Sequence, residues 1–332
     1  MTKLTLAVNG FGRIGRAFFR AAFNDPAFDI VAVNDLGEPE NLAYLLKYDT
    51  NYGPYNKDIA LKAGNLIVGD QKIKLLAEKD PAKLPWSGLE VDVVLECTGI
   101  FRDRAGASGH LQAGAKKVIV SAPCKSADVP TYVLGVNADK YQGENLISMA
   151  SCTTNCLAPI VKILHEEFSL ERGLMTTAHA YTAGQSLQDG PHRDFRRGRT
   201  AGQNIIPTTT GAAVAVTKVI PELEGKLEGL ALRVPISIVS LVDLVAILKK
   251  EATAKKINRL LQKRAAGQLQ GILAVSDEPL VSSDLKQNPH SAIVDLSLTV
   301  VTGNLVKILA WYDNEWGYAN RLAEMAEHIT NK

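Results

Sequence analysis

The stretch LTLAVNGFGRIGR at positions 4–16 decides the fold. It joins a short apolar run, Leu4–Val8, to a glycine-rich turn, and residues 17–23 follow with the apolar content of a helix. A second apolar run, Ile30–Val33, comes shortly afterwards. The order strand, glycine turn, helix, strand predicts a βαβ unit with two parallel strands.

Three glycines in this turn, Gly10, Gly12 and Gly15, have the spacing of a dinucleotide-binding site. Gly10 permits the tight turn, Gly12 lets a pyrophosphate approach the backbone, and Gly15 lets the helix pack on the strand. The helix N-terminus offers free N–H groups to the phosphates. Asp35, at the end of the second strand, is placed to bond ribose hydroxyls and to repel a 2′-phosphate, which favours NAD over NADP. The alternative is that Asp35 only caps a loop.

The composition bounds the class of protein. The chain has 332 residues, 46% of them hydrophobic and 22% charged, with a formal net charge of +2. This length predicts two domains with a core each, and the apolar content excludes a mainly disordered chain. The small net charge gives no sign of a nucleic-acid or membrane-surface coat. Because no apolar run approaches the ~18 residues of a membrane span and four cysteines make no disulfide framework, we expect a cytoplasmic protein with free thiols and no membrane partner.

The βα pattern continues further along the first half. Val91–Cys97 has the composition of a strand, residues 102–113 that of a helix, and Lys117–Val120 that of another strand. Because the carboxyl ends of parallel strands face the cofactor in such a sheet, Thr98 and Ser121 are candidate cofactor contacts. Ordinary strand-to-loop turns explain these two residues equally well.

A candidate nucleophile lies near the middle of the chain, where SCTTNC occupies residues 151–156. Apolar residues on one face of 157–168 predict a helix, and the Ser, Thr and Asn residues before it are typical of an N-cap. Cys152 would then lie near a helix N-terminus, which stabilises the nucleophilic thiolate. Cys152 and Cys156 could instead be two metal ligands, but no nearby His or Cys completes such a site. We expect no metal, and a buried small side chain at Cys156.

A thiol nucleophile usually requires a base, and histidine is suited to proton transfer near neutral pH. His179 lies in a run with strand character, residues 175–182, and is the candidate from spacing. The competing histidines are His110, His165, His192, His290 and His328. His165 would lie about three helical turns from Cys152, and His192 lies in an arginine-rich loop.

Arginines gather in residues 192–199, HRDFRRGR. A patch this short, with one aromatic residue in a nearly neutral chain, fits a small phosphorylated substrate or a subunit contact better than nucleic acid. Residues 207–213, PTTTGAA, lead into a helix whose hydroxyl-rich N-terminus suits an anion. Arg233 is a lone charge among apolar residues, where an arginine at the surface edge is the alternative.

After Arg233 the pattern changes to long strand-like runs. The runs are 238–248, 292–301 and 305–312, a helix at 254–266 interrupts them, and a last helix follows DNEWGY at 313–318 and runs up to about residue 329. Strands grouped in this way predict a mostly antiparallel sheet. We therefore expect an α/β Rossmann-type domain in residues 1–150 and an α+β catalytic domain in residues 151–314.

These motifs resemble those of the phosphorylating glyceraldehyde-3-phosphate dehydrogenases of the glycolytic, NAD-dependent type. The resemblance runs from NGFGRIGR at 9–16 to WYDNE at 311–315, essentially the whole chain, and SCTTNC matches the family's active-site signature. It implies NAD as cofactor, a homotetramer, and a C-terminal helix, residues 315–332, that packs back on the cofactor domain. The implied reaction converts glyceraldehyde 3-phosphate and inorganic phosphate to 1,3-bisphosphoglycerate through a hemithioacetal and a thioester on Cys152.

The resemblance also assigns roles to matching residues. Cys152 would be the nucleophile and His179 its base. The attacking phosphate would be held by Ser151, Thr153, Thr210 and Gly211. The phosphate of the substrate would be held by Thr182, Arg197 and Arg233. The cofactor would be contacted by Arg13, Ile14, Asp35, Lys79 and Ser121 besides the three glycines, and Asn314 would orient the nicotinamide carboxamide.

Two positions depart from the family pattern, and two other functions compete. Gly190 stands where NAD-using members usually have leucine, which leaves the strictness against NADP open, and Lys79 stands where arginine is common. Erythrose-4-phosphate dehydrogenase is a rival on the same scaffold, but Asp35 and the intact TTTG at 208–211 favour the glycolytic enzyme. A non-catalytic nucleotide- or RNA-binding role is disfavoured by the complete set of Cys, His and anion-binding residues, so we expect no nucleic acid as the primary partner.

Overall fold

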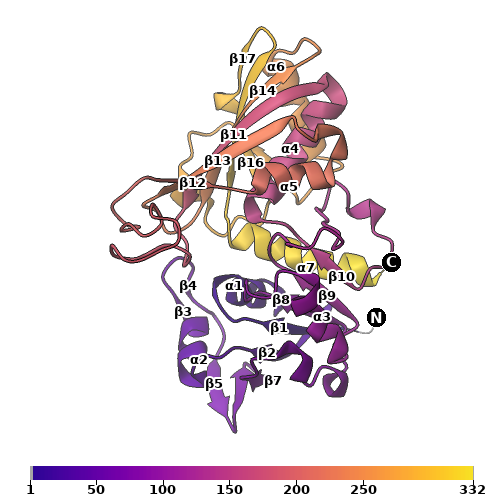
Figure 1. The fold of residues 1–332 in the computed structure, drawn as a ribbon, viewed down its shortest axis with the longest axis vertical. Coiled ribbons are helices and arrows are strands. Elements are labelled where there is room, and N and C mark those ends of the chain that lie inside the picture. Colours follow the sequence, from indigo (N-terminus) through magenta and orange to yellow (C-terminus); the bar gives the residue numbers. More distant parts are fainter. Residues whose placement is uncertain (1–2, 332) are drawn as a thin grey trace. The chain divides into compact units, whose positions relative to one another are not determined.

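The computed structural model describes residues 3–331 and divides the chain into two compact units (Figure 1). Unit 1 comprises the residues up to Tyr132, Lys140–Ala150 and the residues from Ala319 onward. Unit 2 comprises Val133–Asp139 and Ser151–Tyr318. Within the described residues, no helix has both the length and the apolar character needed to cross a membrane.

Unit 1 is built on a sheet that has, within the described residues, eight strands in the order β10-β9-β8-β1-β2-β7-β6-β5. Neighbours from β10 to β7 are parallel, whereas β7, β6 and β5 are antiparallel. The strands are β1 (Leu4–Asn9), β2 (Phe28–Asn34), β5 (Ile59–Lys62), β6 (Asn65–Val68), β7 (Gln71–Leu76), β8 (Val93–Glu96), β9 (Lys117–Val120) and β10 (Leu146–Ser148). The helices are α1 (Arg13–Ala22), α2 (Pro39–Lys47) and α3 (Arg104–Gln112), and β3 (Tyr48–Asp49) pairs with β4 (Gly53–Pro54).

The central position of β1 explains its composition. It pairs with β2 on one side and β8 on the other, and Leu6, Ala7 and Val8 are fully buried. Parallel strands covered on both faces have such continuous apolar runs. Helix α1 begins directly after the glycine turn, and the face that carries Phe18 is buried. The predicted Rossmann-type arrangement is confirmed.

Unit 2 contains a second sheet, whose order within the described residues is β12-β13-β11-β14-β18-β16-β15, with β17 paired to β18. Most neighbours are antiparallel, while β11 with β13 and β15 with β16 are parallel. The strands are β11 (Leu170–Ala180), β12 (Ile206–Thr209), β13 (Leu227–Val234), β14 (Ser240–Leu248), β15 (Leu273–Ser276), β16 (Ala292–Asp295), β17 (Val300–Thr302) and β18 (Leu305–Tyr312). The helices are α4 (Cys152–Phe168), α5 (Ala212–Val219) and α6 (Ala254–Ala265), and α7 (Trp316–Thr330) extends from unit 2 into the residues of unit 1.

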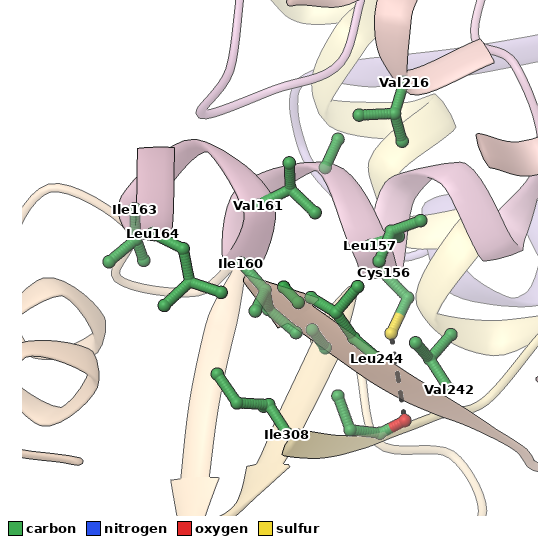
Figure 2. Close-up of a cluster of buried hydrophobic side chains, with 14 of the residues drawn as sticks. Cys156, Leu157, Ile160, Val161, Ile163, Leu164, Val216, Val242, Leu244 and Ile308 are labelled. Atoms are coloured by element: carbon green, nitrogen blue, oxygen red, sulfur yellow. Dashed lines mark hydrogen bonds between the residues drawn. The ribbon is translucent and has the colours of Figure 1, made fainter. Parts of the chain in front are cut away.

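Helix α4 lies against this sheet and forms the centre of the unit 2 core. Figure 2 shows Leu157, Ile160 and Leu164 of α4 packed with Leu244 of β14 and Ile308 of β18, all of them buried. Strand β14 alternates buried and half-buried residues, which is the pattern of a strand with one face on the core. The rigid sheet therefore supports the helix whose first residue is Cys152.

Two expectations about elements are corrected. The run 292–301 is not one strand, because a 3₁₀ turn at Leu296–Leu298 separates β16 from β17. The Ser297 hydroxyl donates to the Asp295 carboxylate at 2.7 Å, and such local bonds compete with strand pairing. The helix expected from residue 102 begins at Arg104, where Asp103 accepts a bond from the Gly106 N–H as N-cap.

Candidate functional site

The glycine turn of unit 1 has the geometry that its spacing predicts. Gly10 has φ +92°, a conformation that L side chains rarely adopt. A Cβ on Gly15 would lie 2.1 Å from the Gly10 carbonyl oxygen, so only glycine allows this approach of helix and turn. A Cβ on Gly12 would meet no atom within 4 Å, and the α1 N-terminus has no side-chain cap at Gly12. The open space and the uncapped N–H groups fit the pyrophosphate of a dinucleotide.

Asp35 closes the same turn from the end of β2. One carboxylate oxygen accepts from the Phe11 N–H at 2.6 Å, and the other accepts from the Gly37 N–H at 2.9 Å. These bonds fix the carboxylate beside the turn, where its remaining lone pairs can accept from ribose hydroxyls. The N–H donors at the start of α1 and the acceptor oxygens of Asp35 therefore fit NAD.

The other expected cofactor residues have different surroundings. Arg13, in the first turn of α1, forms an ion pair with Asp49, and Ile14 beside it is half-buried. Lys79 is exposed in the loop after β7, and Ser121 is half-buried where β9 ends. The structure thus gathers the glycines and Asp35 into one turn and leaves Lys79 on the surface of unit 1.

A buried carboxylate under the glycine turn was missed from the sequence. Glu96, the last residue of β8, is 1% exposed and accepts from Asn9 Nδ2 at 2.6 Å, from the Thr98 N–H at 2.8 Å and from the Thr98 hydroxyl. His110 Nε2 lies 3.1 Å from the same carboxylate, and its Nδ1 accepts from the Trp86 indole at 3.0 Å. Because an indole N–H can only donate, His110 carries its proton on Nε2 and donates it to Glu96. A Glu in an apolar strand was the available signal.

Cys152 and His179 meet in unit 2. Cys152 is the first residue of α4, and the Ser151 hydroxyl caps the helix by accepting from the Thr154 N–H at 3.1 Å. His179 lies one residue before the end of β11, and its Nε2 is 3.6 Å from Cys152 Sγ. Among the described residues, no other histidine lies within hydrogen-bonding distance of this sulfur. The arrangement can pass a proton between thiol and imidazole.

The ionisation of this pair differs from the thiolate that the helix N-terminus led us to expect. Burial raises the pKa of the Cys152 thiol, although Arg233 and Thr153 act in the opposite direction. Burial, together with the nearby charge of Arg233, lowers the pKa of His179 to about 3. Desolvation therefore outweighs the helix terminus, and both groups are neutral near pH 7. A neutral imidazole is the form that can accept a proton.

His179 Nδ1 has two competing neighbours. The Ala180 carbonyl oxygen and Arg233 Nη1 each lie 2.7 Å from it, and Arg233 also donates to that carbonyl at 2.9 Å. A proton on Nδ1 would go to Ala180 O and leave Nε2 free to accept, whereas a bond from Arg233 requires the opposite tautomer. The hydrogen bonds of Arg233 therefore bear on which nitrogen of His179 is basic.

Cys156 lies on the core side of α4. Figure 2 shows its sulfur among apolar side chains, with a bond of 3.9 Å to the Ala310 carbonyl oxygen. Burial raises the pKa of this thiol well above its usual value, and Cys156 is fully buried. Within residues 3–331 no group of three or more potential metal-ligating side chains is found. Cys156 is a core residue, and the structure gives it no partner for a metal site.

The expected anion-binding residues of unit 2 lie on several segments. The Arg197 guanidinium donates to Thr208 Oγ1 at 2.8 Å and lies 3.5 Å from the Asp194 carboxylate. Gly211 is the N-cap of α5 and supplies no side-chain cap, while the Ala212 N–H at that terminus donates to Thr210 Oγ1 at 3.2 Å. The hydroxyl of Thr153 forms a hydrogen bond with the hydroxyl of Tyr312 at 2.9 Å. The exposed Thr182 lies in the loop after β11, and its backbone N–H donates to Gln185 Oε1 at 3.2 Å.

Asn314 lies two residues after the end of β18 and is 5% exposed. Its Oδ1 accepts from the Ser240 hydroxyl at 2.9 Å. Asn314 belongs to unit 2, as do Cys152 and His179.

Comparisons with known proteins agree with this geometry. Residues 4–104 match the family described as glyceraldehyde 3-phosphate dehydrogenase, NAD binding domain, and residues 151–314 match its C-terminal domain. The chain is 52% identical over 330 residues to glyceraldehyde-3-phosphate dehydrogenase 1 of Bacillus subtilis, covering 98% of each chain. It is 54% identical over 331 residues to glyceraldehyde-3-phosphate dehydrogenase of Mycolicibacterium smegmatis, covering 97% of each, and 52% identical over 330 residues to that of Geobacillus stearothermophilus, covering 98% of each. With both of its halves matched in this way, the chain belongs to the glyceraldehyde-3-phosphate dehydrogenase family.

Proposed function

We propose that this protein oxidises and phosphorylates glyceraldehyde 3-phosphate to 1,3-bisphosphoglycerate, with NAD and inorganic phosphate as co-substrates. The observation that carries the proposal is the pairing of Cys152 Sγ with His179 Nε2, in a chain of this family. Cys152 is the nucleophile and His179 the base. The turn formed by Gly10, Gly12 and Gly15 holds the cofactor together with Asp35.

Each step uses the chain's own residues. As Sγ attacks the aldehyde carbon, its proton passes to His179 Nε2, and a hemithioacetal forms on Cys152 as its oxyanion. Loss of a hydride from this carbon, which NAD would accept if bound beside it, would leave a thioester on Cys152. A phosphate oxygen then attacks the thioester carbonyl, and the C–S bond breaks. The sulfur of Cys152 leaves as a thiolate, which takes the proton back from His179.

Two groups of residues serve the two phosphates. Ser151, Thr153, Thr210 and Gly211 hold the attacking phosphate, and Thr182, Arg197 and Arg233 hold the phosphate of the aldehyde. The N-terminus of α5 and the two guanidinium groups support these assignments, because helix N-termini and guanidinium groups bind anions. When a phosphate takes the guanidinium of Arg233, the Ala180 carbonyl is left as the partner of His179 Nδ1. This selects the tautomer whose Nε2 accepts the thiol proton.

The remaining cofactor contacts and the domain roles are part of the same proposal. Arg13, Ile14, Lys79 and Ser121 contact the cofactor, and Asn314 orients its carboxamide. Residues 1–150 with the C-terminal helix form the cofactor domain, and residues 151–314 form the catalytic domain. We place the enzyme in the cytoplasm.

The enzyme works as a homotetramer in this proposal. One face of the unit 2 sheet exposes Leu174, Leu230 and Leu305, and the loop that contains Phe195 leaves this ring 89% exposed. Exposed apolar side chains of this number are typical of surfaces that a partner subunit covers.

The proposal is tested by comparing kcat/KM for glyceraldehyde 3-phosphate and erythrose 4-phosphate with each of NAD and NADP. We expect the highest value for glyceraldehyde 3-phosphate with NAD. A higher value for erythrose 4-phosphate would replace the proposed substrate, and a higher value with NADP would show that Gly190 has relaxed the cofactor choice despite Asp35. Equal binding of RNA and NAD in a titration, without NAD reduction by either aldehyde, would favour the non-catalytic role.

A further inference from the structure

Ser240 joins two parts of unit 2 that lie far apart in the sequence. It is the first residue of β14 and is 1% exposed. Its Oγ accepts from the Ala180 N–H at 3.1 Å and donates to Asn314 Oδ1 at 2.9 Å. One hydroxyl therefore connects the peptide that follows His179 with the side chain of Asn314.

The sheet holds these three residues in register. Strands β11, β14 and β18 are consecutive neighbours, and Ser240 is directly opposite Tyr312. Ala180 is the last residue of β11, and Asn314 follows the end of β18 by two residues. The hydroxyl thus spans the ends of three adjacent strands, and a sheet fixes such positions more closely than a loop does.

The backbone before Ser240 is strained. Val239 is fully buried and has φ +68°, in the left-handed region where a β-branched residue is uncommon. Such conformations persist where the surrounding structure imposes them, and they are concentrated at functional sites. Here the strained residue immediately precedes the hydroxyl that makes both bonds.

The two bonds of Ser240 determine how the Asn314 amide is oriented. Because Oγ already accepts from the Ala180 N–H, its hydrogen is available to donate, and only the amide oxygen of Asn314 can accept it. The reversed amide would give Oγ a second donor and leave the hydroxyl hydrogen without an acceptor. Asn314 Oδ1 is therefore held toward Ser240, and Nδ2 is the end that remains to donate.

We propose that Ser240 is a positioning residue that presents Asn314 Nδ2 to the oxygen of the nicotinamide carboxamide. The inference rests on the proposed function, in which Asn314 binds that group. Ser240 also fixes the N–H of Ala180, the residue whose carbonyl contacts His179 Nδ1. Ser240 accordingly links the orientation of the cofactor ring to that of the base.

The experiment measures equilibrium binding of NAD and of ADP-ribose, which lacks the nicotinamide ring, to the full-length parent and to Ser240→Ala. Loss of one hydrogen bond that orients the amide predicts about tenfold weaker NAD binding and unchanged ADP-ribose binding. Ser291→Ala is the matched control, because Ser291 is buried in the same unit and its hydroxyl has no hydrogen-bond partner among the described residues. It should bind both ligands as the parent does.

Two further variants separate positioning from folding. Ser240→Thr keeps the hydroxyl and should retain NAD binding to within about threefold wherever its melting temperature matches the parent. In an Asn314→Ala background, Ser240→Ala should cause no additional loss of NAD affinity. Equal losses for NAD and ADP-ribose, parent-like NAD binding by Ser240→Ala, or additive losses in the double variant would overturn the proposal. NAD reduction by the parent, assayed in parallel, reports on the proposed function separately.

Discussion

The sulfur of Cys152 lies 3.6 Å from Nε2 of His179, and both groups are neutral in this arrangement. The distance is that of a weak S–H···N contact that transfers a proton when the sulfur attacks a carbon. A general-base step, rather than a thiolate formed in advance, follows from the raised pKa of the thiol and the lowered pKa of the imidazole.

Replacing the nucleophile is the first prediction. Cys152→Ser should lower kcat for NAD reduction at least about 1,000-fold, because a hydroxyl is a far weaker nucleophile beside the same base. The readout is NADH absorbance with glyceraldehyde 3-phosphate and phosphate. Cys156→Ala, which changes the core thiol of α4, should stay within a few-fold of the parent. Phosphate-dependent activity at the parent's level in purified Cys152→Ser would remove Cys152 from its role.

The buried imidazole makes stability depend on pH. The pKa of His179 is about 3 in the folded protein, whereas an unperturbed histidine has a value of about 6.5. Below pH 6.5 the unfolded chain binds a proton that the folded site does not. The contribution of His179 to the free energy of unfolding is therefore complete above pH 6.5 and declines as the pH falls toward 3. At pH 5 the loss is about 2 kcal/mol. Between pH 7 and 5 the melting temperature of the parent should fall a few degrees more than that of His179→Asn.

The same titration contains its own control. Between pH 7 and 8 the parent and His179→Asn should change in parallel, because His179 stays neutral in both the folded and the unfolded chain. Parallel curves down to pH 5 would show that His179 is not buried in its neutral form.

The glycine turn predicts opposite results for two alanine substitutions. Gly15→Ala places a Cβ 2.1 Å from the Gly10 carbonyl oxygen and should lower both the melting temperature and the affinity for NAD. Gly12→Ala meets no atom within 4 Å and should fold as the parent does, but its methyl group would occupy the space of the pyrophosphate. We expect at least about tenfold weaker NAD binding for Gly12→Ala by calorimetric titration. Normal NAD binding by Gly12→Ala would move the phosphates away from this turn.

The carboxylate of Glu96 should be needed for the same turn. Every group that Glu96 bonds is a donor, so Glu96→Gln would turn an N–H₂ toward donors in a buried place. The cost is about 2–4 kcal/mol, seen as a lower denaturant midpoint, and NAD binding should weaken because Asn9 immediately precedes Gly10. Glu90→Gln, at an exposed position of unit 1, is the matched control. Equal stability of the two variants would contradict the network.

Local patterns predicted the parts of the fold and site that depend on neighbouring residues. The glycine turn and the Cys152 helix N-terminus each follow from residues close together in the chain. The break at Leu296 was hidden because Asp295, Ser297 and Thr299 alternate with apolar residues, which is the pattern of a strand. In the structure the Ser297 hydroxyl instead bonds Asp295 within a 3₁₀ turn. The antiparallel strands β5 to β7 carry no motif and were not predicted.

Such patterns could not predict contacts between residues that are far apart in the sequence. Ser240 is separated by 60 residues from Ala180 and by 74 from Asn314, and neither Ser240 nor its neighbours have a distinctive motif. Glu96 and His110 lie on a strand and a helix whose side-chain directions require the structure. The helix terminus suggested a thiolate at Cys152, but the burial that raises its pKa is a property of the folded unit.

In the proposed reaction, phosphate releases the product from a thioester on Cys152. The most direct measurement mixes the enzyme with saturating NAD and glyceraldehyde 3-phosphate in a phosphate-free buffer and follows NADH by stopped flow. We expect a burst of about one NADH per Cys152 followed by a slow phase, and continuous turnover when inorganic phosphate is added. Rapid turnover without phosphate, at the rate seen with it, would show that phosphate does not release the product.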